Sequence, residues 1–411
     1  MKPRWKTTLM VAAVVCAGIF SAGSIATRNL ALDTTYTSLR LFNEVLSLIQ
    51  KSYVDEVDSD SLMKGAYEGM LSGLDPFSEY FTPEEYAAYQ AYSGKDKAAA
   101  GGTKHAGADV GLRLARKDGA VLVVAVKPGS DAEQRGITPG DFVRRLGGDS
   151  AREMHMFQIE SLMDGVAGST LAIQVARREE PRKIETDLAR KQTPPGQPSL
   201  TVQDQAAGIA VLKIPHFLPG AAQAVAGQLE RARKQRVSRL LIDLRGNAWG
   251  SMDEAARTAG LFLGDAVVAR LKGKNDVVRE LRGGRGKEET TASISLLVSS
   301  STAEAAEMFA AALHDGRSAT IMGETTFGVG AEQEFIALNN GGWLRLSTRK
   351  YVSPAGTAWH GTGLKPGELI PAGGEGTMSQ RMERQLQKAV DRVRTEKAAS
   401  AAPSRGEPGA L

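Results

Sequence analysis

Hydroxyl side chains gather just ahead of a carboxylate in the stretch SSSTAE. Residues 299–302 are three serines and a threonine, and Glu304 follows two positions later. A hydroxyl attacks a carbonyl only when a neighbouring base removes its proton, whereas a carboxylate can itself act as a base toward water. No Lys or His recurs at a fixed spacing from these hydroxyls. The residue types alone therefore predict no complete nucleophile–base pair here, and leave Glu304 as a base on water as the local alternative.

The residues that usually bind metals are scattered. The five histidines stand at positions 105, 155, 216, 314 and 360, and those at 314 and 360 are more typical of structural than of catalytic roles. No cluster of His, Asp or Glu has ligand spacing, and the single Cys16 excludes an intrachain disulfide framework and a cysteine-rich zinc site. The sequence therefore predicts neither a metal nor a cofactor.

The positive net charge of the chain comes from its N-terminal residues. Lys2, Arg4, Lys6 and Arg28 account for the whole formal net charge of +4, since the rest of the chain holds equal numbers of basic and acidic residues. No Lys/Arg cluster with interleaved aromatic residues occurs elsewhere, which argues against nucleic-acid binding. With 411 residues, 42% of them apolar, the chain is long enough for two or three domains with hydrophobic cores.

The N-terminus is typical of a targeting segment. Its basic residues precede an uncharged run, 7–26, which at ~20 residues is also just long enough to span a bilayer. Residues 24–26, SIA, offer a small-residue cleavage site. We expect residues 1–30 to be a cleaved signal peptide or an uncleaved signal-anchor, with membrane contact only through 7–26. In both cases the body of the protein lies in the cell envelope or periplasm, or outside the cell.

Residues 34–93 are predicted to form a helical region. Apolar residues between 41 and 49 recur at helical spacing, and Ser59 or Asp60 can cap a second helix. Thr82 before Pro83 starts a third, with Thr as the cap and Pro at the first helical position. Residues 94–106 lack apolar periodicity and are interpreted as a linker.

The segment 107–178 changes to strand-like patterns. VLVVAV at 121–126 indicates a buried strand, and LAIQV at 171–175 alternates between apolar and other residues. Residues 157–163 favour a short helix between them. These features predict a small, partly open β-barrel with one or two short helices.

The remainder of the chain favours a layered α/β domain. A Pro-containing linker, 190–203, leads into residues 204–375, where strand and helix patterns alternate. Strands are expected at 208–214, 240–244, 294–299, 319–323 and 343–348, and helices at 219–236, 251–264 and 303–315.

The C-terminal end is expected to be helical and then disordered. Residues 376–397 form a charged helix in which Leu386, Val390 and Val393 make a short apolar seam, and 398–411 form a disordered tail. The predicted fold class is therefore α/β multidomain, with an N-terminal helical region, a small β-barrel, an α/β core and a C-terminal helix.

Three blocks of the sequence together resemble the carboxyl-terminal processing proteases, also called tail-specific serine proteases. The block 53–86 is similar to the N-terminal helical region of that family. The block that runs from DVGLRL to LAIQV looks like its embedded PDZ domain. LLIDLRGN at 240–247, with the segments 305–330 and 350–366, looks like its protease core. The blocks occur in the family's order, so the resemblance covers residues 40–395 and implies a serine-peptidase fold.

The resemblance implies a peptide-binding groove in the PDZ-like segment. A PDZ domain receives an extended peptide as an added strand, and amides of a Gly-containing loop hold the terminal carboxylate. Val110, Gly111 and Leu112 stand at that loop. Four apolar residues are expected to line the groove, with plain core packing as the alternative for some of them: Leu112, Leu114, Ile159 and Met163. The implied ligands are C-terminal or extended segments of envelope proteins.

At the catalytic positions the chain departs from the family it resembles. In the family, a Ser at the start of a helix attacks, a Lys removes its proton, and a Gln orients the Lys. The matching residues here are Glu304, Val329 and Gln333, with the spacing kept, because Val329 lies 25 residues after Glu304 and Gln333 a further four. A carboxylate is a poor nucleophile for amide hydrolysis, since the acyl intermediate would be an anhydride. Val329 has no proton acceptor.

The oxyanion region that the resemblance implies is also altered. The family's turn D-L-R-x-N-P-G-G reads here with Ala248 in place of Pro and Trp249 in place of the first Gly. The region consists of Trp249, Gly250 and the amide of Ala305, so a bulky indole stands beside the expected place of the substrate carbonyl. We expect Glu304 to fill this pocket, since an acid is favoured at the free amides of a helix N-terminus.

These departures predict a catalytically silent pseudoprotease that binds peptide segments as an adaptor, decoy or regulator. Two alternatives stay open: an active peptidase with non-standard catalytic residues, and a structural subunit of a mixed oligomer with an active paralogue. A homo-oligomer through the terminal helices is also allowed, unless the C-terminal helix simply packs on its own domain.

Overall fold

A computed structural model describes residues 36–99, 108–177, 183–284 and 290–395. The chain divides into two compact units, 1–70 and 71–411. Within the described ranges, no helix is both long and apolar enough to cross a membrane. The predicted targeting run at 7–26 and the predicted tail at 398–411 lie outside those ranges.

The first unit contains a helix at residues 36–52 and the start of α2 (Ser59–Ser72). Asp58, rather than the expected Ser59 or Asp60, caps α2, because its carboxylate accepts the amide of Ser61 at 2.9 Å. The helix at 36–52 exposes much of its apolar face to solvent. Leu39, Leu41 and Leu48 are each more than half exposed. Within this unit, therefore, the apolar face predicted for the first helix is left largely uncovered.

The second unit begins with β1 (Glu79–Phe81) and α3 (Pro83–Ala99). Thr82 caps α3 as predicted: its hydroxyl accepts the Glu85 amide at 3.2 Å, and the Glu85 carboxylate accepts the Thr82 amide at 2.8 Å. The helix continues through residue 99, so the predicted start of a linker at 94 is wrong. Ala and Lys favour helix without apolar periodicity, which is why the pattern missed this extension.

Residues 108–177 and 183–191, which we call the strand-rich module, form mainly antiparallel sheet with two short helices. The central strands lie in the order β3-β4-β5-β8-β9, with β6 beside β5, and β2 pairs with β7. The bounds are β2 Ala108–Asp109, β3 Leu112–Lys117, β4 Ala120–Val126, α4 Asp131–Gln134, β5 Phe142–Leu146, β6 Asp149–Ser150, α5 Met156–Met163, β7 Asp164–Gly165, β8 Thr170–Ala176 and β9 Lys183–Ala189. The expected boundary at 178 is too early, because β9 pairs with β8 along its whole length.

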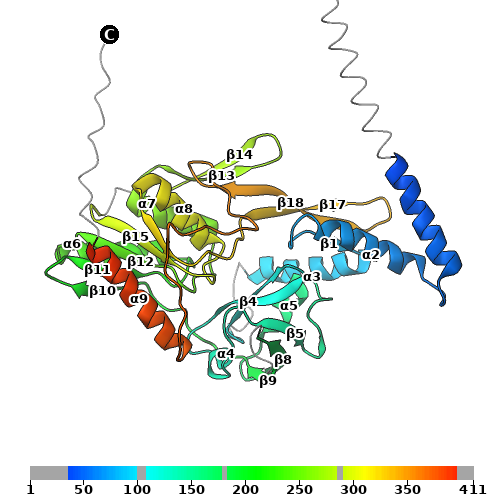
Figure 1. Ribbon diagram of the computed structural model, residues 1–411, viewed down its shortest axis with the longest axis horizontal. Coiled ribbons are helices and arrows are strands. Elements are labelled where there is room, and N and C mark those ends of the chain that lie inside the picture. Colours follow the sequence, from blue (N-terminus) through cyan, green and yellow to red (C-terminus); the bar gives the residue numbers. More distant parts are fainter. Residues whose placement is uncertain (1–35, 100–107, 178–182, 285–289, 396–411) are drawn as a thin grey trace, which may run out of the picture. The chain divides into compact units, whose positions relative to one another are not determined.

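The α/β core contains a sheet in the order β10-β11-β12-β15-β16-β19, parallel except where β10 meets β11. Figure 1 labels β10, β11, β12 and β15 of this sheet. Its strands are β10 Ser199–Asp204, β11 Ile209–Lys213, β12 Arg239–Asp243, β15 Ser293–Val298, β16 Thr320–Gly323 and β19 Glu368–Leu369. Because β10 begins at Ser199, the predicted linker 190–203 extends too far.

Helices cover both faces of this sheet. Ala210 and Leu212 of β11 pack in one cluster with α6 (Ala221–Lys234), α7 (Met252–Leu263) and α8 (Ala305–Arg317). Ile209 and Val211, which point the other way, pack with α9 (Met378–Thr395). The predicted seam of Leu386, Val390 and Val393 belongs to this second cluster. It therefore packs on its own domain, which was the alternative to self-association through this helix.

A second sheet, order β1-β18-β13-β14 with β17 beside β18, joins the core to the segment around β1. Its other members are β13 Val267–Lys272, β14 Val277–Arg282, β17 Ala331–Ala337 and β18 Trp343–Val352. Only β18 was expected. The antiparallel pairing of β17 with β18 places Gln333 opposite Ser347.

Candidate functional site

Glu304 occupies a strained turn between β15 and α8. Its backbone has φ 55° and ψ −115°, and it is the residue that precedes the first turn of α8. A non-glycine residue held at positive φ costs about 1–3 kcal/mol, and such strain gathers at functional sites. A sharp strand-to-helix turn of this kind is how hydrolases present a nucleophile. The backbone at position 304 therefore has the form of a nucleophile turn, while the side chain is a carboxylate.

The Glu304 carboxylate pairs with Arg113 of the strand-rich module. Arg113 Nη2 donates to Glu304 Oε1, and Arg113 Nη1 lies 3.9 Å from Glu160 of α5. The Glu304 charge raises the pKa of Arg113 above its usual value, so the guanidinium stays protonated. In the described part of the chain, the Ala305 amide makes no hydrogen bond to this carboxylate. The Glu304 carboxylate also forms a capping box with Glu307 at the start of α8, so it combines the ion pair with a position at the helix N-terminus.

The loop that carries Val329 is held by a buried carboxylate. Glu307 of α8 accepts the amides of Gly328 at 2.7 Å and Val329 at 2.8 Å, and the hydroxyl of Thr326. Burial raises the pKa of Glu307 to about 8, although these donors oppose the shift. The Val329 side chain packs against an apolar cluster that includes Phe327. Position 329 therefore supplies no base, and its loop is fixed through the backbone.

Gln333 is bonded within the second sheet. Its side-chain amide donates to Ser347 Oγ at 3.3 Å, and its carbonyl oxygen accepts from Arg345 at 3.4 Å. The side chain that would orient a catalytic Lys in the family is thus engaged with β18.

The turn after β12 contacts both the C-terminal helix α9 and the apolar cluster around Phe327. Arg245 pairs with Asp243 at 2.7 Å and donates to Gln385 of α9 at 3.1 Å, both within the protein interior. This ion pair therefore anchors the C-terminal helix. Further along, Ala248 and Trp249 join the apolar cluster around Phe327.

Gly250 stands in this turn at φ 124°, directly against Phe217. A Cβ at residue 250 would lie 2.2 Å from the Phe217 backbone, so the close approach requires glycine.

The neighbouring hydroxyls and two of the histidines make hydrogen bonds to nearby backbone groups, and in the described residues these contacts form no second nucleophile–base pair. Thr302 Oγ1 donates to the Leu244 carbonyl at 2.9 Å, and Ser299 Oγ accepts the Ser301 amide. His314 lies 2.9 Å from the Ala319 carbonyl, and His360 Nδ1 accepts the Gly330 amide at 3.3 Å. The histidine at position 105 lies outside the described residues.

The predicted peptide-binding residues are all buried. They lie in the core of the strand-rich module rather than along an open groove: Val110, Gly111, Leu112, Leu114, Ile159 and Met163. Core packing, the alternative to a groove lining, therefore describes the five apolar members. At the loop itself, the Gly111 amide donates to Asp109 Oδ1 at 2.7 Å.

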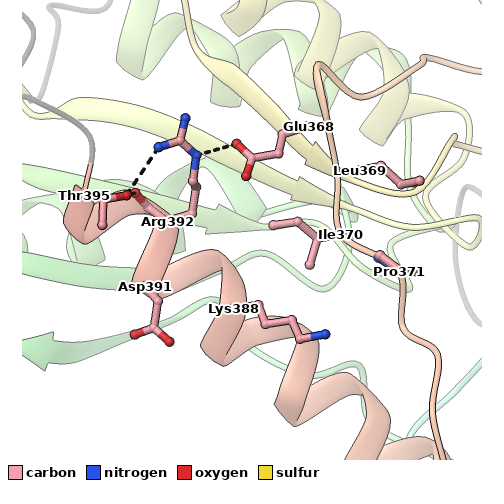
Figure 2. A pocket seen from close by; sticks show the side chains of 8 residues that line it. All are labelled: Glu368, Leu369, Ile370, Pro371, Lys388, Asp391, Arg392 and Thr395. Atoms are coloured by element: carbon pink, nitrogen blue, oxygen red, sulfur yellow. Dashed lines mark hydrogen bonds and ion pairs between the residues drawn. The ribbon is translucent and has the colours of Figure 1, made fainter.

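One open pocket lies between β19 and α9 (Figure 2). It has a volume of about 410 Å³, and its lining includes Leu369, Ile370, Lys388 and Arg392. Arg392 bonds to Glu368 at 2.5 Å. None of the predicted site residues lines this pocket. Within the described residues, no group of His, Cys, Asp and Glu could hold a metal ion.

Comparison with known proteins identifies the family of the α/β core. Residues 208–370 match the model described as peptidase family S41, and residues 18–85 match that of the activating protease CtpB N-terminal domain. The match assigns residues 208–370, which form most of the α/β core, to peptidase family S41. The S41 match contains residues 304, 329 and 333, so all three substituted or retained positions discussed above fall within it.

Relatives of this chain span most of its length. A probable CtpA-like serine protease of Staphylococcus aureus (strain N315) is 28% identical over 368 residues, which cover 89% of this chain and 71% of the relative. The carboxy-terminal processing protease CtpA of Bacillus subtilis (strain 168) is 28% identical over 326 residues, or 79% of this chain and 67% of that protein.

A solved structure shares the fold of this chain. The photosystem II D1 C-terminal processing protease superimposes with a TM-score of 0.62 at 22% identity, covering 80% of this chain and 92% of that one. The mixed α/β fold with helices at both ends is therefore the family's fold.

Three residues of the site were not singled out from the sequence. Arg113 sits in a strand pattern 191 residues away from its partner, and nothing local marks it. Glu307 could have been noticed as a carboxylate inside an otherwise apolar helix. Arg245 lies in a motif that was recognised, but its contact with α9 is a long-range feature.

Proposed function

We propose that this protein is a pseudoprotease: a processing-protease scaffold without peptidase chemistry that binds extended polypeptide segments as an adaptor or regulator. The observation that carries the proposal is the ion pair of Glu304 with Arg113 at the family's nucleophile position. A carboxylate held by a guanidinium is neither a nucleophile toward amides nor a free base toward water. The alternative in which Glu304 activates water therefore has no support from the geometry.

The base position supports the same proposal. Val329 offers only its backbone, and both polar groups of that backbone are used: the amide by Glu307 at 2.8 Å and the carbonyl by Trp359 at 3.2 Å. In hydrolytic triads, loss of the nucleophile or the base alone removes about a million-fold in rate. Both are missing here.

The test compares cleavage of unfolded and tail-bearing polypeptides by three forms of the protein lacking residues 1–30: wild type, Glu304→Ala, and Glu304→Ser with Val329→Lys. We expect no cleavage by the first two. Cleavage by wild type that disappears in Glu304→Ala would overturn the proposal and indicate a non-serine mechanism at this turn. Cleavage gained by the double variant would show that the rest of the protease scaffold can still support catalysis.

The binding part of the proposal rests on the strand-rich module, which we propose to be a PDZ domain. β3 stands at the end of its sheet, with α5 against it. An extended peptide adds to such an edge through main-chain hydrogen bonds. Because the apolar residues between β3 and α5 are buried, a ligand must part these two elements in order to enter.

Two glycines of this module allow a matched test of peptide binding. Gly111 and Gly119 both have positive φ, but a Cβ would lie 2.1 Å from Ser130 Cβ at the first and in open space at the second. We expect Gly111→Ala to weaken the affinity for extended peptides at least about tenfold and Gly119→Ala to leave it unchanged. Fluorescence anisotropy with carboxylate-ended and amidated peptides measures both. Equal affinities for both variants would contradict a role for this loop.

We further propose that the protein acts in the cell envelope, and that it assembles through the helix at 36–52 rather than through α9. The exposed Leu39, Leu41 and Leu48 support a partner on that helix, whereas the α9 seam is already occupied. A second copy and an active paralogue are the two candidate partners. Size-exclusion chromatography with light scattering separates them, since only self-association changes the mass of the isolated protein.

A further inference from the structure

The substituted catalytic region contacts one face of the strand-rich module. Along β3, Arg113, Ala115 and Lys117 alternate with the residues that face the core of the module. All three of these outward residues meet the family's catalytic region in the α/β core. The contacts are polar and apolar, and they come from three separate segments of that core.

The polar contacts frame the site from two sides. Arg113 pairs with Glu304 in the turn before α8. Lys117 Nζ donates to the Phe327 carbonyl at 3.0 Å and lies 5.0 Å from the centroid of the Phe327 ring. A partly desolvated cation over an aromatic face adds to the hydrogen bond. Two cations of β3, Arg113 and Lys117, therefore bind the turn at residue 304 and the loop at residue 327.

The apolar contacts fill the space between them. Val124 and Ala125 of β4 are buried in one cluster with Ala248, Ala303 and Phe327. Trp249 and Val329 pack against the same cluster. In the family the last two positions hold a glycine and a lysine. An indole and an isopropyl group provide apolar surface where those residues would provide a gap and a charge.

We propose that three of the substituted positions, Glu304, Trp249 and Val329, together form an interdomain lock that holds the strand-rich module against the family's catalytic region. Glu304 supplies the counter-charge for Arg113, and Trp249 and Val329 supply the apolar seat for β4. A serine at 304 could not neutralise Arg113, and a lysine at 329 would place an ammonium against an apolar surface already flanked by two cations. The substitutions thus remove chemistry and create a docking surface in the same step.

The Glu304–Arg113 ion pair can hold the strand-rich module in one position on the α/β core. Their side chains are 26% and 30% exposed, so the pair is neither freely solvated nor fully desolvated. Charge-assisted pairs in this regime are stronger than surface ion pairs and still respond to salt. The lock is therefore expected to loosen as ionic strength rises.

Hydrogen exchange on the full chain tests the lock, read at β3–β4 and at the segments 302–308 and 327–330. We expect Glu304→Gln and Arg113→Gln each to speed exchange at both faces about tenfold. Exchange in β11 and β12, inside the α/β core, should stay at the wild-type rate and so report an intact fold. Glu280→Gln, which removes a carboxylate paired with Arg270 and Arg282 in the second sheet, is the matched control and should change nothing at either face.

A charge reversal separates a specific lock from a general loss of stability. Arg113→Glu alone should open the interface, and Arg113→Glu with Glu304→Arg should return exchange toward the wild-type rate. Unchanged exchange in the single variants, or no recovery in the reversed pair, would overturn the proposal. The readout contains no substrate, so it is independent of whether the protein proves to cleave peptides.

Discussion

Glu307 accepts the amide of Val329 in a hydrogen bond of 2.8 Å, so a buried carboxylate fixes the loop on which the family places its catalytic base. The same carboxylate also accepts the Glu304 amide at 3.0 Å. One side chain thus ties the turn at residue 304 to the loop at residue 329, the positions of the nucleophile and the base in the family. The hydrogen bonds that connect the two positions are present, while the residues at them are glutamate and valine.

Replacing Glu307 tests these hydrogen bonds. Glu307→Ala leaves the amides of Gly328 and Val329 buried without an acceptor, and each such group costs about 1–3 kcal/mol. We expect a loss of about 2–4 kcal/mol in the free energy of unfolding, measured by urea denaturation. Glu324→Ala, which removes a carboxylate that accepts the Ala372 amide in a less buried loop, is the comparison and should cost less. Equal losses of unfolding free energy in the two variants would show that the burial of Glu307 does not increase its contribution to stability.

The strained backbone at Glu304 predicts an unusual effect of glycine. Both Glu304→Ala and Glu304→Gly remove the ion pair with Arg113, but only glycine adopts φ 55° and ψ −115° freely. The glycine variant should therefore be more stable than the alanine variant by about 1 kcal/mol, although glycine usually weakens a structure. Thermal denaturation of the two proteins compares them directly. A less stable glycine variant would mean that the turn is not strained.

His155 predicts how stability depends on pH. Burial lowers the pKa of His155, but Glu79 and Glu85, 3.6 and 3.4 Å from its two ring nitrogens, outweigh this and raise the pKa to about 9. Because the folded-state pKa lies above the ordinary histidine value of 6.5, the contribution of this charge to stability is complete below pH 6.5 and is lost as the pH rises through about 9. The loss amounts to about 3 kcal/mol.

The measurement is the difference in unfolding free energy between wild type and His155→Gln from pH 6 to pH 10. Taking the difference cancels other titrating groups, Glu307 among them. The advantage of wild type should shrink steadily across this range. A difference that stays constant with pH would show that the imidazole is not held as a cation by the two carboxylates.

Arg245 predicts the attachment of α9. Removing its side chain leaves Asp243 as an unpaired charge in the interior and takes away the bond to Gln385. Arg245→Ala should cost about 3–5 kcal/mol. Arg392→Ala, which breaks an exposed pair between α9 and Glu368 of β19, should cost less than about 1 kcal/mol. Similar losses in the two variants, measured by chemical denaturation, would contradict an anchoring role for Arg245.

The sequence predicted those parts of the fold that have local signals. All five strands and all three helices expected between residues 208 and 348 occur there, because buried strands and amphipathic helices have distinct periods. β17 was missed since its sequence, AEQEFIA, is polar, and only its pairing with β18 makes it a strand. β9 was missed for the same reason. Its alternation of apolar and polar residues is weak, and its strand conformation depends on the pairing with β8.

The site was predictable in identity but not in contacts. The positions 304, 329 and 333 follow from motif and spacing. The partner of Glu304 does not, because Arg113 is 191 residues distant and a strand residue of this type is usually solvated. The expected groove lining was ambiguous for a related reason. Apolar residues such as Ile159 and Met163 suit both a groove and a core, and only the packing of α5 against β3 distinguishes the two.

The central claim is that the wild-type protein does not hydrolyse peptide bonds, and incubation in ¹⁸O-labelled water tests it most directly. Every hydrolysed bond places one oxygen atom from water in the new terminal carboxylate, which mass spectrometry detects. With unfolded and tail-bearing polypeptides, we expect wild type to give no more labelled termini than heat-inactivated protein. Labelled termini that increase with time and with protein concentration, and that disappear in Glu304→Ala, would contradict the account.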